Sequence, residues 1–159
     1  AVPLHTVRIH GVDYAWIYQA PPEVAQARQA DFGPNVRLRG YNLQAPMHAG
    51  QTQSIELNWQ VLGRAPADAM LFAHLIGPDG KRYGQLDLPY PISSWNPGSY
   101  LSTELPLAVA ADAQPGTYRL VVGMYDPVTQ QRLPLTSADR LDPAIDGPDA
   151  LLLAEVRVE

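Results

Sequence analysis

The chain has 159 residues, of which 46% are hydrophobic and 17% charged, a composition that indicates one globular domain with its own core rather than a disordered segment. Its formal net charge of -5 argues against non-specific binding of nucleic acid, which needs a basic surface. Because there is no cysteine, a disulfide framework, a thiolate nucleophile and a thiolate metal site are all excluded.

The N-terminal segment is rich in β-branched and aromatic residues. Two such runs, residues 5–10 and 13–18, flank Gly11 and predict a β-hairpin. Pro21 and Pro22 follow, with a run of small and polar residues that we interpret as a connector. We therefore divide the chain into a hairpin, a connector and a β-sandwich domain, at residues 1–20, 21–30 and 31–159.

The main domain is predicted to consist of short strands. In residues 52–61, hydrophobic and polar side chains alternate with a period of two, which is typical of a strand with one buried face. Similar runs between turn residues predict further strands at residues 36–43, 70–76, 81–88, 100–109, 132–135 and 151–158. Gly40, where the alternation changes phase, indicates a bulge, and Pro106 indicates an edge strand or a bulge.

The chain is organised around residues 115–127, PGTYRLVVGMYDP. A Pro-Gly turn begins this segment, alternating residues follow, and Asp126-Pro127 ends it, so we predict a central strand. Tyr118 lies where some sandwiches have a tyrosine corner, although we interpret it as a plain core aromatic.

Together these patterns predict an all-β antiparallel β-sandwich of about eight or nine strands, preceded by the N-terminal hairpin. Pattern alone does not separate an immunoglobulin-like from a jelly-roll topology. The space between the two sheets is expected to be filled by packed side chains, without a catalytic site.

The loop at residues 89–100 is the best candidate for ligand binding. Flat aromatic faces with a few polar groups can recognise sugar rings. The candidate glycan-binding residues are Tyr90, Trp95, Asn96 and Tyr100. The alternative is that Trp95 closes one end of the sandwich core, where Trp59 is also expected.

A second loop carries four carboxylates. Oxygen ligands on a turning loop can bind calcium, so we consider a structural calcium site formed by Asp139, Asp142, Asp146 and Asp149. The spacing is not that of an EF-hand, and a plain surface loop is the alternative. No other cofactor is predicted.

Catalytic residues are not evident. Glu56 and Glu104 lie on the polar faces of their strands and could approach one another as a glycosidase pair requires, but solvated strand faces are the favoured interpretation. His74, in an apolar run, is expected to be a core or second-layer histidine bonded to a neighbouring strand.

Several segments, in order along most of the chain, carry a family resemblance: VRIHGVDYAWIY, VRLRGYNL, IELNWQVL, LFAHLIGPDG, SSWNPGSY and PGTYRLVVGMYDPVTQQRLP. They resemble the soluble β-sandwich at the C-terminus of bacterial multi-pass membrane proteins. Those proteins are similar to dolichyl-phosphate-mannose-protein mannosyltransferases, which are glycosyltransferases that use lipid-linked sugars.

The resemblance implies an extracytoplasmic domain that follows a membrane region, which would explain a chain that begins without Met. In that family catalysis belongs to the membrane portion, so the resemblance implies a non-catalytic accessory domain that recognises or positions a glycan or acceptor. The expected partners are the parent membrane domain and carbohydrate, and not nucleic acid. The alternative is a structural or protein-interaction module without a small ligand, and a glycosidase is the least favoured.

Overall fold

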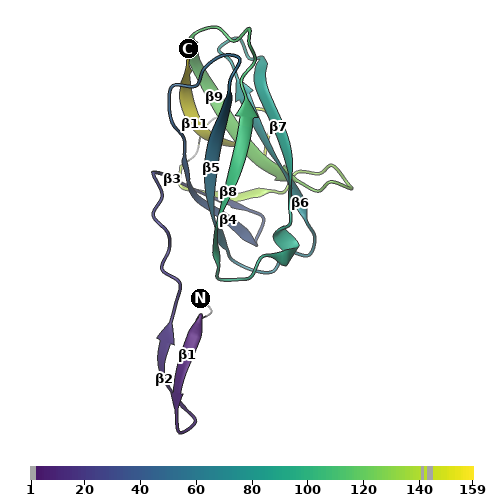
Figure 1. The fold of residues 1–159 in the computed structure, drawn as a ribbon. Helices are drawn as coiled ribbons and strands as arrows, with labels where there is room; N and C mark the ends of the chain where they lie inside the picture. The colour runs from purple at the N-terminus through teal and green to yellow at the C-terminus, as the bar shows by residue number, and fades with distance from the viewer. Residues whose placement is uncertain (1–2, 141, 143–144) are drawn as a thin grey trace.

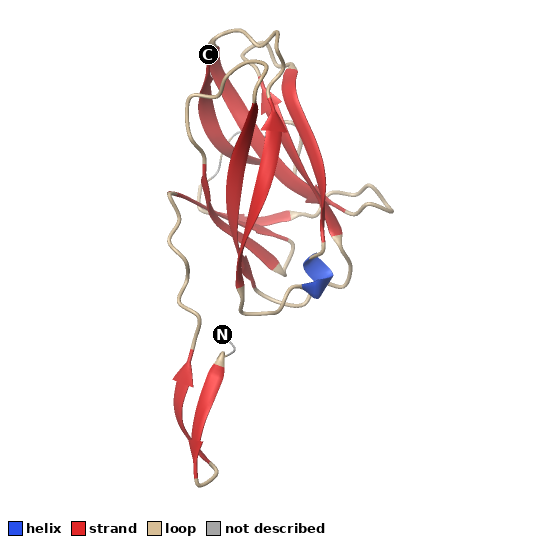
Figure 2. Ribbon diagram, viewed as in Figure 1, coloured by secondary structure: helices blue, strands red, loops and turns tan. Residues whose placement is uncertain are grey.

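The computed structural model describes residues 3–140, 142 and 145–159. Within them the chain forms a hairpin followed by a β-sandwich, and the one helical element is a short 3-10 turn, η1 (Ile92–Ser94) (Figure 1, Figure 2). The hairpin strands are β1 (His5–Ile9) and β2 (Val12–Ile17). The sandwich strands are β3 (Gln26–Phe32), β4 (Val36–Asn42), β5 (Thr52–Val61), β6 (Ala69–Ile76), β7 (Arg82–Tyr90), β8 (Tyr100–Ala108), β9 (Gly116–Tyr125), β10 (Leu135–Ala138) and β11 (Leu151–Val158). The predicted all-β sandwich with an N-terminal hairpin is therefore confirmed.

Two antiparallel sheets enclose the core (Figure 1). The five-stranded sheet has the order β10-β3-β4-β5-β8, and the four-stranded sheet has the order β11-β9-β6-β7. β5 and β8 are therefore neighbours in one sheet, and β6 and β9 in the other. Taking β4, β5 and β8 as strands A, B and E, and β6, β7, β9 and β11 as C, C′, F and G, this arrangement is immunoglobulin-like rather than a jelly roll.

Trp59, near the C-terminal end of β5, lies at one end of the core. Its side chain is 0% exposed, and Nε1 donates a hydrogen bond to Oγ1 of Thr103 over 2.9 Å. The ring packs edge-on against Phe32 and Tyr90, with centroids 6.0 and 5.9 Å away. Burial of a large apolar side chain stabilises a fold by roughly 1.5–3 kcal/mol, so this cluster contributes strongly to the sandwich.

Gly40 marks the predicted bulge in β4. The register between β4 and β5 shifts between Leu38 and Gly40. A Cβ atom on Gly40 would lie only 2.4 Å from the carbonyl oxygen of Gln26 and 2.9 Å from Cβ of Val24. Glycine is required here because the neighbouring chain crosses too closely for any side chain.

The predicted places of β8 and β9 are also confirmed. β9 lies between β6 and β11, and is thus a central strand, whereas β8 is at the edge of its sheet. Pro106 therefore occurs in an edge strand, where its missing N–H breaks no internal ladder.

Tyr118 combines the two roles considered from the sequence. Its side chain is 1% exposed, as expected of a core aromatic, and its hydroxyl donates to the carbonyl oxygen of Gln114 over 2.9 Å. A tyrosine near the start of strand F that bonds the backbone a few residues upstream is a tyrosine corner. The interpretation of Tyr118 as a plain core aromatic was therefore incomplete.

The boundary predicted between connector and sandwich was wrong, because β3 already begins at Gln26 and pairs with β4. The alternation was hidden by Arg28, a charged residue that is 1% exposed. Similarly, the short strand expected at residues 132–135 lies further along, as β10, which pairs with β3. Arg132 forms only an isolated bridge with Tyr125.

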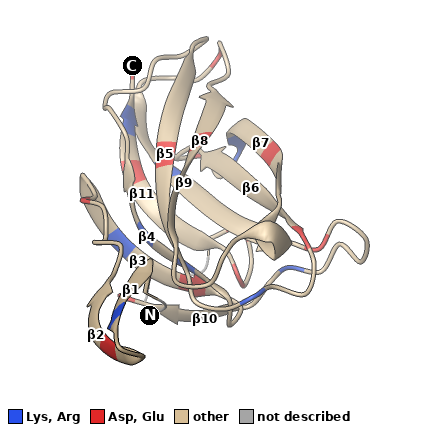
Figure 3. Ribbon diagram, turned by 60° about the horizontal axis from the view of Figure 1, so that its bottom comes forward, with Lys and Arg blue, Asp and Glu red and all other residues tan. Residues whose placement is uncertain are grey.

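The hairpin lies apart from the sandwich (Figure 1). Every residue of β2 is exposed, and none of the buried residues that form the core belongs to the hairpin. Near its tip, a basic position of β1 (blue) and an acidic position of β2 (red) lie close together (Figure 3). They are Arg8 and Asp13, whose Nε and Oδ1 atoms are 2.5 Å apart. Across the described residues, no helix has the length and apolar character needed to cross a bilayer.

Candidate functional site

The predicted glycan site in the loop after β7 is partly built into the core. Tyr90 is 4% exposed, its hydroxyl hydrogen-bonds with that of Thr103, and burial raises its pKa to about 12. Trp95 is half-buried, with its ring centroid 5.6 Å from that of Tyr90 and 6.4 Å from that of Trp59. The alternative role for Trp95, closing one end of the core, matches this geometry. Tyr90 thus offers no face to a ligand, and Trp95 only part of one.

The other two residues of that prediction lie outside the core. Asn96 is exposed, and Tyr100 is half-buried with the guanidinium of Arg39 4.9 Å from its ring centroid. Tyr100 also lines a hollow with Tyr18 and Gln60, where the segment after the hairpin passes the sandwich. The four predicted residues therefore do not share one surface.

Two of the four predicted calcium ligands surround Arg28. Asp142 Oδ2 accepts a hydrogen bond from Nη2 over 2.6 Å, and Asp139 Oδ1 accepts one from Nη1. Asp139 Oδ2 also accepts the backbone N–H of Gln29 over 2.9 Å. Burial opposes the charge of Asp139, but the Gln29 amide and the Arg28 guanidinium hold the pKa of its carboxyl below the ordinary value. These carboxylates balance a buried cation of the chain itself.

The other two aspartates lie elsewhere. Asp146 contacts His74 and Arg82, and Asp149 Oδ1 accepts the backbone N–H of Leu135 over 2.9 Å. Over residues 3–140, 142 and 145–159, no group of three or more His, Asp or Glu side chains is arranged to hold a metal ion. The structure does not gather the four aspartates, and calcium binding remains a prediction.

Glu56 and Glu104 do lie opposite one another, paired between β5 and β8. Both side chains are on the outer face of the five-stranded sheet, where Glu104 is exposed and Glu56 is half-buried. Glu104 Oε2 accepts from the hydroxyl of Ser54, and Glu56 Oε1 from that of Ser102 over 3.4 Å. They form part of a polar strand face, as the favoured interpretation supposed.

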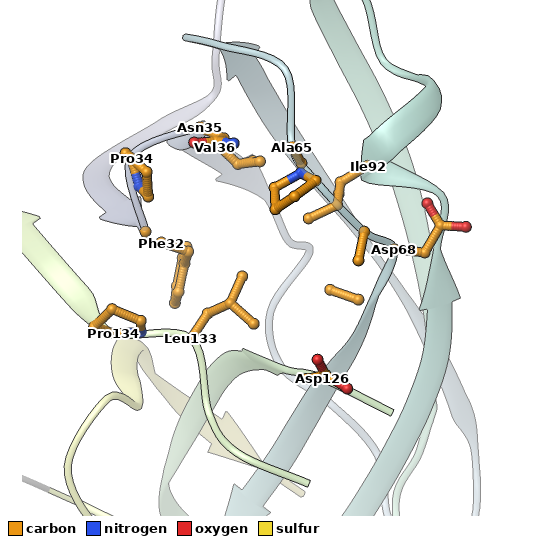
Figure 4. Close-up of a pocket in the computed structure, with 14 residues that line it drawn as sticks. Phe32, Pro34, Asn35, Val36, Ala65, Asp68, Ile92, Asp126, Leu133 and Pro134 are labelled. Atoms are coloured by element: carbon orange, nitrogen blue, oxygen red, sulfur yellow. The ribbon is translucent and has the colours of Figure 1, made fainter. Parts of the chain in front are cut away.

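An apolar pocket of about 240 Å³ opens at one end of the sandwich (Figure 4). It is formed by the β3–β4 turn, the β5–β6 connection, η1 and residues after β9. Phe32, Ile92 and Leu133 supply much of its lining. The carboxylate of Asp126 beside it already accepts the backbone N–H groups of Val128 and Thr129 over 2.7 and 3.0 Å. The pocket suits an apolar group better than a polyhydroxylated one.

A second, polar hollow of about 370 Å³ lies on the outer face of the four-stranded sheet. β6 contributes Phe72 and His74, β7 contributes three polar side chains, and β9 and the residues after it complete the lining. The ring of Phe72 lies directly over Gly123, where a Cβ atom would be 2.3 Å from its Cζ. The glycine thus leaves room for the aromatic ring, which lines the hollow.

Asp146 holds lining residues of this hollow in place. Its carboxylate is 14% exposed and contacts Nδ1 of His74, while Oδ1 accepts from Nη2 of Arg82 over 2.9 Å. Burial works against the charge, yet hydrogen bonds from Arg82 and His74 hold the pKa of the Asp146 carboxyl below its ordinary value. His74 is 5% exposed and its ring centroid lies 4.9 Å from that of Phe72, so it is buried as predicted. Its side-chain partner, however, is Asp146 of the β10–β11 connection and not a neighbouring strand.

Sequence reasoning did not find this hollow as a site. Gln85 and Asp87 alternate with Leu86 and Leu88 along β7, a pattern that is typical of an ordinary solvated strand face. The signal available was the run around His74, which is apolar on both faces and therefore implies cover over the outer side of the sheet.

Comparisons with known proteins do not assign a function to these surfaces. No family model matches the sequence, and no curated protein matches it. Among solved structures, a presumed β-galactosidase from Bacteroides fragilis matches with a TM-score of 0.37 and 12% identity, over 64% of this chain. The chain spans 15% of the length of that structure. A likeness at this level carries no conclusion about what the chain does.

Proposed function

We propose that this chain is a non-catalytic accessory domain on the extracytoplasmic face of a bacterial membrane, within a larger membrane protein similar to glycosyltransferases that use lipid-linked sugars. In this role the sandwich positions a glycan or acceptor, and the hairpin holds the sandwich at the bilayer. The observation that carries the proposal is the exposed apolar surface of the hairpin. Its large exposed hydrophobic side chains are Leu4, Val7, Ile9, Val12, Tyr14, Trp16, Ile17 and Tyr18.

A hairpin of this composition needs a partner. Isolated two-stranded hairpins are at best marginally stable in water, and monomeric proteins seldom expose contiguous apolar patches of this kind. The exposed side chains include large aromatic ones: Trp16 is 52% exposed and Tyr14 is 66% exposed. Burying such side chains releases roughly 1.5–3 kcal/mol each, so covering the hairpin would be strongly favourable.

The aromatic residues favour a lipid–water interface as that partner. Tyr14, Trp16 and Tyr18 alternate along β2 and just beyond it, so they project from one face. Tyrosine and tryptophan have an apolar ring with a polar tip, and they concentrate at the headgroup level of membranes. The family resemblance, which puts a membrane region just before this hairpin, supports the same location.

The test is vesicle binding by the full chain. Sedimentation with vesicles of phosphatidylcholine and phosphatidylglycerol should bring down the protein, and the double variant Trp16→Ser, Tyr14→Ser should stay in solution. Val128→Ser is the matched control, since Val128 is 88% exposed but lies in a sandwich loop. The membrane role would be contradicted if the full chain does not bind vesicles, or if the double variant binds them as well as the original.

The same hairpin supports a second candidate, a protein-interaction module without a small ligand. In that case the hairpin would be covered by a second copy or by the parent protein. Sedimentation velocity would then show a dimer that the Trp16→Ser, Tyr14→Ser variant abolishes, and vesicles would not compete with it. A glycosidase remains the least favoured function. It would be supported if the chain hydrolyses chromogenic glycosides and the Glu56→Gln variant does not.

A further inference from the structure

The geometry points to a binding site for a neutral sugar ring in the polar hollow over β6, β7 and β9. This inference deepens the proposed function by naming a surface that would face the glycan. It rests on residues of the sandwich alone, so it can fail while the membrane role of the hairpin stands, and the reverse.

The polar side chains of the hollow are held in place before any ligand arrives. Asp87 Oδ1 accepts from the hydroxyl of Tyr125 over 3.1 Å, and its Oδ2 accepts from Nε2 of Gln85 over 3.3 Å. Nη1 of Arg82 donates to Oε1 of Gln85 over 3.4 Å. A connected row of donors and acceptors therefore crosses the hollow, and its order reduces the entropy lost on binding.

The charges within the hollow compensate one another. Arg82 and Arg132 both pair with Asp146, and Asp87 adds a second carboxylate among the lining residues. Arg132 is further occupied, because its Nη1 donates to the backbone oxygens of Asp146 and Pro148 over 2.6 and 3.1 Å. An anion would meet the carboxylate of Asp87, and a cation the guanidiniums of Arg82 and Arg132. The balance favours a polar ligand without net charge.

Sugar hydroxyls fit the groups that remain. Each hydroxyl both donates and accepts, and the hollow alternates carboxylate acceptors with amide and guanidinium donors. Asp87 keeps lone pairs beyond the two it already uses, and Arg82, 45% exposed, keeps N–H groups beyond those bonded to Gln85 and Asp146. Adjacent hydroxyls of one ring could bridge such neighbouring groups on β7.

An aromatic surface completes the match. The ring of Tyr125 is half-buried and lies 6.4 Å, centroid to centroid, from that of Phe72, at an angle of 34°. Phe72 is covered by the guanidinium of Arg132 at 4.6 Å, which leaves Tyr125 as the ring available to the C–H face of a sugar. The volume, about 370 Å³, is near the lower end of the roughly 300–1,000 Å³ of small-molecule pockets and suits a terminal sugar rather than a long chain.

The experiment is a titration of the ¹⁵N-labelled full chain followed by NMR. The probes are methyl glycosides of glucose, galactose, mannose and N-acetylglucosamine, with glucuronate and inorganic phosphate as charged probes. At least one neutral glycoside is expected to shift amide signals of β6, β7 and residues 125–132. Asp87→Ala and Tyr125→Ala should each weaken this binding about tenfold or more, which corresponds to about 1.4 kcal/mol.

The variants are chosen to keep the fold. Asp87 is exposed, and Tyr125 is half-buried but does not belong to the core cluster, so either replacement leaves the core intact. Glu155→Ala, an exposed position on β11 in the same sheet but outside the hollow, is the matched control and should bind like the original chain. The inference is overturned if no neutral glycoside shifts these amides, if Asp87→Ala and Tyr125→Ala bind as the original does, or if glucuronate or phosphate binds there more tightly than every neutral probe.

Discussion

Nη2 of Arg28 donates to Oδ2 of Asp142 over 2.6 Å, joining two residues 114 positions apart in the chain. Arg28 also donates from Nε to the carbonyl oxygen of Leu152 over 3.1 Å and contacts Asp139. This one side chain, in β3 of one sheet, thus ties down the long connection between β10 and β11 and reaches a strand of the other sheet.

Replacing Arg28 by Ala should destabilise the fold by roughly 3 kcal/mol, at the low end for a buried ion pair because both aspartates keep some contact with water. Urea unfolding monitored by Trp fluorescence measures the change. Arg8→Ala is the control, since its pair with Asp13 is exposed and should contribute under about 1 kcal/mol. Equal losses from both variants would show that the burial of Arg28 has no special weight.

Acid should weaken the sandwich through Asp139 and Asp146. Both carboxyls have a pKa lowered from the ordinary 3.8, so they contribute stability that is complete above that value and is lost as the pH falls through their lower values in the folded chain. The free energy of unfolding, read from urea melts, should therefore decline as the pH falls below about 4. Asp146→Asn should flatten that decline, whereas the exposed Asp112→Asn should not; parallel curves for all three chains would contradict the assignment.

Tyr118→Phe removes only the hydroxyl of the tyrosine corner. The bond to Gln114 over 2.9 Å is lost and a partly buried carbonyl loses its partner, so the free energy of unfolding should fall by about 1–2 kcal/mol. Tyr14→Phe, on the exposed hairpin, should change it by less than about 0.5 kcal/mol. Indistinguishable melts of the two variants would mean that the corner does not stabilise the sandwich.

Gly40→Ala should severely destabilise the fold, by several kcal/mol, because the new methyl group would overlap the Gln26 carbonyl at 2.4 Å. Gly63→Ala is its matched control: no heavy atom lies within 4 Å of the added group. Thermal unfolding followed by circular dichroism compares them. A Gly40→Ala protein that melts like Gly63→Ala would show that the β3–β4 crossing can open at little cost.

Removal of residues 1–17 should leave the sandwich intact, since the hairpin contributes nothing to its core. The free energy of unfolding should change by no more than about 0.5 kcal/mol, while vesicle binding disappears. Urea melts and vesicle sedimentation on the same truncated chain test both halves of this expectation. A truncated chain that unfolds readily would instead make the hairpin part of the sandwich fold.

The strands could be predicted where one face is apolar and the other polar. β5 and β11 were predicted with the observed limits, and the bulge at Gly40 and the edge position of Pro106 followed from backbone chemistry. The start of β3 was missed because its buried position holds Arg28, whose neutralising partners come from the far end of the chain. A two-residue pattern cannot reveal such a charge pair.

The candidate sites were harder to predict for a related reason. Tyr90 and Trp95 are residue types that commonly bind sugar rings. Whether their rings face the core or solvent depends on Trp59, more than 30 residues away in the chain. The hollow is likewise assembled from β6, β7 and the end of β9, segments whose polar residues look ordinary when taken singly. Only the topology brings Asp87 and Tyr125 to within a hydrogen bond.

The prolines of the two neighbouring edge strands have a consequence for self-association. Pro106 in β8 and Pro89 in β7 each interrupt the row of donors that an incoming strand would need, and the carboxylate of Glu104 is exposed beside one of them. Fibril growth by edge-to-edge addition should therefore be blocked on this flank of the sandwich, and crowded copies should remain separate even when their hairpins are brought together.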